Sequence, residues 1–155
     1  MGKLVSAYFS PDRGCDDVVI GFIDHCDTFL DVAIYSLTHD PIADAFIRAH
    51  QRGCKVRVLM DKSQAGNRDA DDEKLEAAGI EVRRDHQKGV MHNKFLIGPA
   101  RKRGKAVLTG SYNFTKNATY SNTENFVVLR LQYIANEYQT EFDRLWVADA
   151  PLETD

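Results

Sequence analysis

Two short stretches of the chain carry polar side chains suited to phosphate chemistry. In the first, residues 91–97 (MHNKFLI), His92 and Lys94 are two residues apart. Residues at this spacing in a strand point to the same face, so we expect the imidazole and the ammonium group side by side. A neutral imidazole can attack phosphorus or carry a proton, and Lys94 can neutralise a phosphoryl oxygen. The pair therefore indicates chemistry on a phosphate diester.

The second stretch is residues 109–115 (TGSYNFT), which follows the apolar segments 95–97 and 106–108. If these two segments form a hairpin, the second stretch returns beside the His/Lys pair. Gly110 then permits a close backbone approach, and Asn113 offers amide donors to the same phosphate. The two stretches together predict one site.

Other polar residues are candidates for the same site. Glu124, one strand further on, can fix the tautomer of His92 and stabilise a charged intermediate, although spacing alone does not single it out. Ser111 is included as a supporting hydroxyl. Ser36 and Tyr112 are candidate contacts to substrate, with a strand-end hydroxyl and a buried ring as the plain alternatives.

Charge is unevenly distributed along the chain. The formal net charge is -3, yet residues 83–105 hold eight basic residues and one acidic residue, a local charge of +7 that leaves -10 for the remainder. Such a field can gather an anionic ligand. Four of these cations lie in the connection of the expected hairpin and are candidate contacts to a substrate backbone, with a solvated basic loop as the alternative: Arg101, Lys102, Arg103 and Lys105.

The hydrophobic pattern predicts one α/β domain over residues 1–155, with a mixed β-sheet and helices on both of its faces. The first half alternates strands and helices, which predicts a parallel sheet. The second half adds the hairpin, another strand and a closing helix. The expected strands are 4–9, 29–37, 55–60, 80–83, 95–97, 106–108 and 126–131, and the expected helices are 18–26, 40–53, 69–78 and 133–146.

Composition restricts the class of protein. Cys15, Cys26 and Cys54 are an odd number without CxxC or Cys/His clustering, so we expect buried free thiols and neither disulfides nor a zinc site. The sequence shows no apolar run long enough for a membrane span and no signal peptide, which predicts a cytosolic protein without stable membrane association.

Taken in order, these motifs resemble the phospholipase D superfamily, whose pattern is HxK, four residues, D, and later GSxxN or the nuclease-type GSxNFT. Residues 33–37 and 49–61 also resemble the upstream part of the family. The motif aspartate would fall at Pro99, which in view of its structural role in the family indicates a remodelled hairpin. The matching residues are His92 and Lys94, then Gly110, Ser111, Asn113, Phe114 and Thr115, then the Glu124-Asn125 pair.

The resemblance implies a two-step reaction in which His92 attacks phosphorus and water resolves the phosphohistidine. A second histidine protonates the leaving oxygen. Because this chain has a single motif, the resemblance implies a homodimer with the site at its interface. The resemblance further implies that Lys94, Asn113 and their partner-chain equivalents replace a metal ion in stabilising the developing charge, so no metal or other cofactor is expected.

Three functions follow from this reading. A nuclease acting on DNA or RNA is favoured by the single motif, the GSxNFT variant and the +7 stretch. Hydrolysis of phospholipids is the second, and it would call for an apolar membrane-facing patch or anchor that the sequence does not show. The third is a catalytically weakened nucleic-acid-binding module, motivated by Pro99, in which His92 would be dispensable.

Overall fold

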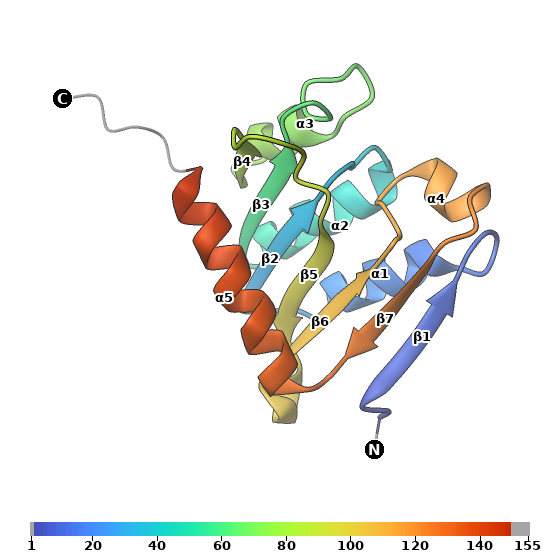
Figure 1. Cartoon of the computed structure of the whole chain (residues 1–155). Coiled ribbons are helices and arrows are strands. Elements are labelled where there is room, and N and C mark those ends of the chain that lie inside the picture. Colours follow the sequence, from blue (N-terminus) through green and yellow to red (C-terminus); the bar gives the residue numbers. More distant parts are fainter. Residues whose placement is uncertain (1, 150–155) are drawn as a thin grey trace.

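A computed structural model describes residues 2–149 as three layers, with one mixed β-sheet between helices (Figure 1). Residue 1 and residues 150–155 of the predicted domain lie outside the described residues. The strands are β1 (Val5–Phe9), β2 (Phe29–Ile34), β3 (Lys55–Asp61), β4 (Glu81–Asp85), β5 (Lys94–Pro99), β6 (Lys105–Gly110) and β7 (Asn125–Leu129). The helices are α1 (Cys15–Asp24), α2 (Asp40–Gln51), α3 (Asp72–Ala77), α4 (Lys116–Tyr120), α5 (Gln132–Ala148) and a 3-10 turn, η1 (Arg101–Arg103).

The sheet has the strand order β1-β7-β6-β5-β2-β3-β4. As predicted, β2, β3 and β4 are parallel and are connected through α2 and α3. The prediction of a parallel arrangement is wrong for β1. This strand is outermost on the side of the sheet away from β4, and it pairs antiparallel with β7. The Tyr8 ring of β1 stacks on Phe126 of β7 at 5.2 Å, a contact between distant segments that the strand-helix alternation does not reveal.

Strand β5 is reversed relative to β2 and pairs antiparallel with both β2 and β6. Lys94 lies opposite Ile34, and Phe95 lies opposite Thr109, so β5 begins where β2 and β6 end. Strand β3 also ends there, and β7 begins there. We call this end of the sheet the site edge and the opposite end the far edge; the site edge is uppermost in Figure 1.

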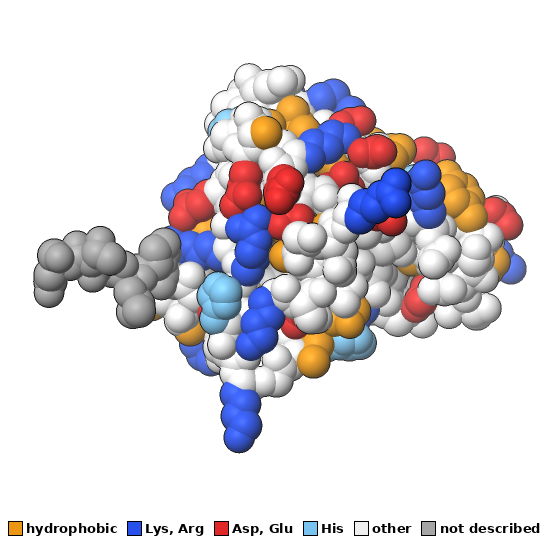
Figure 2. Space-filling model, turned by 90° about the horizontal axis from the view of Figure 1, so that it is seen from above, with side chains coloured by type: hydrophobic (Ala, Val, Ile, Leu, Met, Phe, Trp, Pro, Cys, Tyr) orange, Lys and Arg blue, Asp and Glu red, His pale blue; other side chains and the backbone are white. Residues whose placement is uncertain are grey.

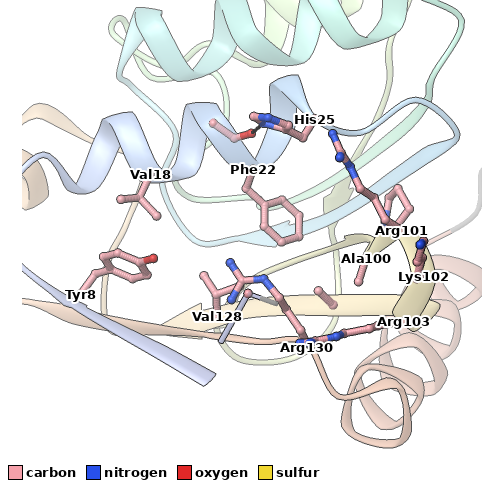
Figure 3. Close-up of a pocket in the computed structure, with 14 residues that line it drawn as sticks. Tyr8, Val18, Phe22, His25, Ala100, Arg101, Lys102, Arg103, Val128 and Arg130 are labelled. Carbon is pink, nitrogen blue, oxygen red and sulfur yellow. Dashed lines mark hydrogen bonds between the residues drawn. The ribbon is translucent and has the colours of Figure 1, made fainter. Parts of the chain in front are cut away.

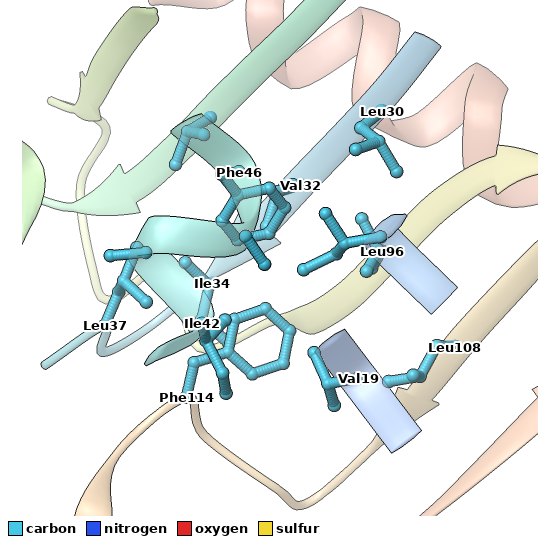
Figure 4. Close-up of a cluster of buried hydrophobic side chains, with 14 of the residues drawn as sticks. Val19, Leu30, Val32, Ile34, Leu37, Ile42, Phe46, Leu96, Leu108 and Phe114 are labelled. Atoms are coloured by element: carbon cyan, nitrogen blue, oxygen red, sulfur yellow. The ribbon is translucent and has the colours of Figure 1, made fainter. Parts of the chain in front are cut away.

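Both faces of the sheet are covered by apolar side chains, and helices lie on both, as predicted. Phe46 of α2 and Leu96 of β5 are fully buried on the face covered by α1 and α2 (Figure 4). Phe95, Phe142 and Trp146 form the layer between the sheet and α5. Burying a side chain of this size stabilises the fold by about 1.5–3 kcal/mol, so the two layers fix the strands firmly.

All three cysteines are buried and free, as predicted from their number and spacing. Burial raises the pKa of the Cys26 thiol to about 12. A thiol with such a pKa is inert as a nucleophile at neutral pH, and these cysteines therefore serve as core side chains.

Candidate active site

His92 and Lys94 lie side by side at the site edge. Strand β5 begins at Lys94, and His92 lies in the extended segment just before it. The Lys94 Nζ atom is 3.1 Å from Nδ1 and 3.4 Å from Nε2 of His92, and it donates a hydrogen bond to the His92 carbonyl oxygen at 2.9 Å. The His92 side chain is exposed, so a solvent-borne substrate can reach the imidazole.

Tyr35, the residue after β2, supports this pair. Its ring centroid lies 4.6 Å from that of His92, and the Lys94 ammonium lies 5.3 Å from the centre of the same ring. Its backbone N–H donates to the Asn93 carbonyl oxygen at 3.0 Å, which extends the β2–β5 pairing past the strand ends. Tyr35 therefore limits the positions that both side chains can adopt.

Lys94 is half-buried, and its charge depends on its surroundings. Burial lowers the pKa of Lys94 below its ordinary value, while the Glu124 carboxylate acts in the opposite direction by favouring the ammonium form. The Glu124 side chain accepts a hydrogen bond from Asn122 Nδ2 at 3.5 Å. Within residues 2–149, no hydrogen bond joins Glu124 to His92, so its contact with the imidazole stays a prediction.

Asn113 is held against the end of β2. Its Oδ1 atom accepts a hydrogen bond from the Ser36 backbone N–H at 3.2 Å, and the Phe114 N–H donates to the Ser36 carbonyl oxygen at 3.2 Å. With Oδ1 engaged in this way, the side-chain NH₂ group of Asn113 is the part available to a ligand. The structure thus brings Ser36 and Asn113 together at the site edge.

Gly110 and Ser111 hold the end of β6 against the start of β7. A Cβ atom on Gly110 would lie 2.1 Å from the Asn125 carbonyl oxygen, so only glycine fits at this position. The Ser111 N–H donates to the Asn125 carbonyl oxygen at 2.9 Å, and the Asn125 N–H donates to Ser111 Oγ at 3.1 Å. Ser111 therefore fixes the segment that carries Glu124 and has a positioning role.

Asp61, at the end of β3, is a positioning residue that the sequence analysis did not single out. Its side chain is 1% exposed, and it accepts hydrogen bonds from the Met91 N–H at 2.9 Å, from the Ser63 N–H at 2.8 Å and from the Ser63 hydroxyl. Burial alone would raise the pKa of Asp61, but these hydrogen bonds outweigh it and hold the pKa below its ordinary value. The sequence feature that could have identified Asp61 is an acidic residue at the end of an apolar strand.

The four basic residues of the hairpin connection are not at this site. Arg101, Lys102 and Arg103 form η1, and Lys105 begins β6, both at the far edge. Five residue steps along β5 correspond to about 17 Å, so these cations do not surround His92. The structure therefore separates the predicted substrate-binding loop from the predicted catalytic residues.

The prediction that Tyr112 contacts substrate is wrong. Its side chain is 1% exposed, and its hydroxyl group lies 2.6 Å from Thr119 Oγ1. Its ring packs against Phe126 at 5.4 Å. Position 112 points into the core because its neighbours at 111 and 113 occupy the surface of the turn.

Charges of both signs are mixed on the site edge, which Figure 2 shows from above. A polar cavity of about 610 Å³ adjoins the site through Ser36 and Thr115. Arg68 and Lys116 line it together with acidic residues that include Asp71. Burial, with the neighbouring Asp40 carboxylate, raises the pKa of Asp71 to about 6. The electrostatic field at this edge therefore comes from nearby side chains of both charge signs.

Two of the other histidines have local structural contacts. His39 is buried, with Nε2 3.0 Å from Asp16 Oδ2, and the Nδ1 atom of His25 lies 2.6 Å from the Gly21 carbonyl oxygen. In the part of the chain that the structure describes, no three or more His, Cys, Asp or Glu side chains are grouped so as to hold a metal ion.

Residues 19–146 match the family model described as cardiolipin synthase, PLD-like domain. The chain belongs to the phospholipase D superfamily. Among curated relatives, a mitochondrial cardiolipin hydrolase of Chlamydomonas reinhardtii is 37% identical over 117 residues, 76% of this chain and 51% of that protein. A phospholipase D of Rickettsia conorii is 34% identical over 134 residues, 86% of this chain and 65% of the relative. The chain thus spans half to two thirds of these superfamily members.

Solved structures show the same superfamily fold. Nuc from Salmonella typhimurium, described as a phospholipase D family member, superposes with a TM-score of 0.83 at 28% identity, covering 92% of this chain and 93% of Nuc. NucT from Helicobacter pylori gives a TM-score of 0.81 at 23% identity, with 92% and 94% coverage. The single-domain mixed-sheet fold is therefore that of the phospholipase D superfamily.

The position of the predicted departure from the superfamily motif, Pro99, lies away from His92 and Lys94. Pro99 ends β5 and pairs with Lys105 at the far edge, five residues after Lys94. Replacing an aspartate there changes the hairpin end and removes no group from beside His92. The basic turn η1 follows after Ala100, and the remodelling of the hairpin stays a prediction.

Asp61→Ala should lower the free energy of unfolding at neutral pH by about 1–3 kcal/mol, because the buried Met91 N–H loses its acceptor. The pKa of Asp61 is depressed in the folded chain, so its contribution is present above the ordinary aspartate value and is lost as the pH falls through the folded-state value. The difference from wild type should therefore shrink in acid. Urea unfolding across pH measures this.

Asp27→Ala is the matched control, because Asp27 is exposed and lies in a loop. It should unfold like the wild type at every pH. Equal stability of the two variants at neutral pH would contradict the role assigned to Asp61.

Proposed function

We propose that this chain hydrolyses phosphodiester bonds of nucleic acids, DNA or RNA, without a metal ion. The observation that carries the proposal is the exposed His92 imidazole with the Lys94 ammonium 3.1 Å from its Nδ1 atom. Asn113 and Glu124 are held at the same edge by the contacts described above. The likeness over nearly the whole chain to Nuc, described as a phospholipase D family member, supports phosphodiester chemistry at this site.

In the proposed first step, a ring nitrogen of His92 attacks phosphorus, a P–N bond forms and the P–O bond to the leaving group breaks. A second histidine gives its proton to the departing oxygen. In the second step, water attacks phosphorus, breaks the P–N bond and returns a proton to the second histidine. The Lys94 ammonium and the Asn113 NH₂ group stabilise the charge on the non-bridging oxygens.

The second histidine is His92 of a second copy of the chain, since one copy carries one such motif. The other four histidines lie elsewhere: His39 is buried against Asp16. His25 and His50 lie at the ends of α1 and α2 that meet the far edge, and His86 follows the edge strand β4, three strands from β5. We therefore propose a two-fold homodimer in which two site edges meet.

An open apolar strip offers the dimer contact. Helix α5 packs on β6, β5 and β2, while β7 and β1 lie beyond it (Figure 1). On this open face, Val5 is 48% exposed and Phe9 is 52% exposed, and Val127 lies between Ala7 and Thr109 in the sheet. Phe9 lies opposite Asn125, so a copy packed here reaches the site edge.

Phospholipid hydrolysis is the second candidate. It is favoured by the relatives of 37% and 34% identity that bear the names cardiolipin hydrolase and phospholipase D. The described helices, α1 to α5, include none with the length and apolar character needed to cross a membrane. The same His92 chemistry would act on a lipid phosphate, so the substrate has to be decided by experiment.

The direct test is a set of substrates offered side by side with excess chelator: single- and double-stranded DNA, RNA, cardiolipin vesicles and an activated phosphodiester. We expect cleavage of nucleic acid and of the activated ester. His92→Ala should lower the rate by at least about a thousandfold, because the nucleophile is lost. His86→Ala, at an exposed histidine outside the site, should match the wild type.

The other outcomes separate the alternatives. Cleavage of cardiolipin with untouched nucleic acid would replace the proposal with the lipid candidate. A shift of nucleic acid in a gel without cleavage of any substrate would establish a binding module instead.

Site sharing is tested by refolding wild-type and His92→Ala chains together in different ratios. If each site needs two His92 side chains, activity should follow the square of the wild-type fraction, about one quarter at an equal mixture. Chains that act alone would give a linear decline, which would rule out the shared site. Mixtures with His86→Ala should keep full activity at every ratio.

A further inference from the structure

A second cavity, of about 730 Å³, opens at the far edge of the sheet (Figure 3). Its walls are mainly apolar and come from α1, β1, β6 and β7: Tyr8, Val18, Phe22, Ala106 and Val128. Its rim carries five basic side chains and no acidic one: His25, Arg101, Lys102, Arg103 and Arg130. The basic loop that the sequence assigns to substrate binding therefore borders a separate cavity.

The rim arginines and the lysine have no anionic partner among residues 2–149. Arg130 Nη1 donates to the Lys3 carbonyl oxygen at 3.1 Å and to Ser6 Oγ at 3.4 Å, both uncharged acceptors. Arg103 Nη1 is buried and has no hydrogen-bond partner in that part of the chain. By contrast, Arg57 and Arg84 each pair with a buried aspartate. A buried guanidinium donor without an acceptor is costly, so Arg103 favours a ligand that carries an anion. Arg101 and Lys102 are exposed and add positive charge at the rim.

The cations are presented by a fixed turn. The Ala100 N–H donates to the Gly104 carbonyl oxygen at 2.7 Å, and the Arg103 N–H donates to the Ala100 carbonyl oxygen at 2.9 Å. Arg101 has φ 43°, a left-handed conformation that is uncommon for a residue other than glycine and that recurs at ligand clamps. Such a turn loses little conformational freedom when a ligand binds.

We propose that this cavity binds a single-chain anionic amphiphile, independently of the reaction at His92. A phosphate or carboxylate head group accepts hydrogen bonds from the guanidinium groups of Arg101, Arg103 and Arg130. The aliphatic chain lies against Val18 and Phe22 of α1. The volume is within the range of pockets that enclose small ligands, about 300–1,000 Å³.

A nucleic-acid strand fits this cavity less well. Residues 95–98 of β5 are buried between the two edges, so no exposed path along this strand joins the cavity to His92. Tyr8 already stacks on Phe126, and Phe22 is the other aromatic ring among the described residues that line the cavity, so few groups can stack bases. A cationic rim over an apolar wall matches an amphiphile in both charge and polarity.

The probe is dodecyl phosphate below its micellar concentration, titrated calorimetrically into the full chain. Inorganic phosphate, dodecanol and a dinucleotide are the comparison ligands. Dodecyl phosphate should bind at least about tenfold more tightly than each of them, since only it satisfies both the rim and the wall. Equal binding of inorganic phosphate, tighter binding of the dinucleotide, or no binding of dodecyl phosphate would overturn the proposal.

Two variants locate the site. Arg103→Gln removes a rim charge and Val18→Trp fills the apolar end; each should weaken dodecyl phosphate binding at least about tenfold. Arg130→Gln replaces Arg103→Gln if the latter does not fold by circular dichroism. Lys55→Gln, at an exposed cation that does not line the cavity, is the control and should bind like the wild type. Unchanged binding in both folded cavity variants would overturn the assignment.

Discussion

The arrangement of this protein depends on the reversed central strand β5. Because β5 runs antiparallel to β2 and β6, its first residues meet the ends of β2, β3 and β6 and the start of β7. Polar side chains from these four segments, distant in sequence, therefore lie near His92 and Lys94 at one edge. The buried layers on both faces hold the strands in this register. The packing of the whole sheet therefore offsets the free-energy cost of partly burying the Lys94 ammonium group.

The same constraint separates two regions that adjoin in sequence. The turn after β5 must lie at the edge opposite His92, which places Arg101 to Arg103 over the apolar cavity. The mixed charges at the site edge suit chemistry at a single phosphate, where Lys94 and Asn113 act at short range. The cationic rim at the far edge suits retention of an anion. If both proposals hold, one chain presents two anion-binding environments with different chemistry.

Much of the fold could be predicted because apolar periodicity reports strands and helices directly. The bounds of β3 and α2 were nearly right, whereas α4 and η1 were missed because one or two turns leave no periodic pattern. Strand β1 was misplaced because pairing with β7 depends on contacts between distant residues. Tyr112 was misassigned, and the position of the basic loop at the far edge was not foreseen, because nearness in sequence does not fix direction in space. Asp61 was missed because its partner Met91 is 30 residues away.

The central claim is that His92 is the group that bonds to phosphorus. The most direct measurement is rapid alkaline quenching during turnover of a phosphodiester, followed by mass spectrometry of the peptides, because phosphohistidine survives in base. The account predicts one phosphoryl adduct on the peptide that carries His92, present during turnover and absent from His92→Ala. Turnover with no adduct, or an adduct on another residue, would contradict it.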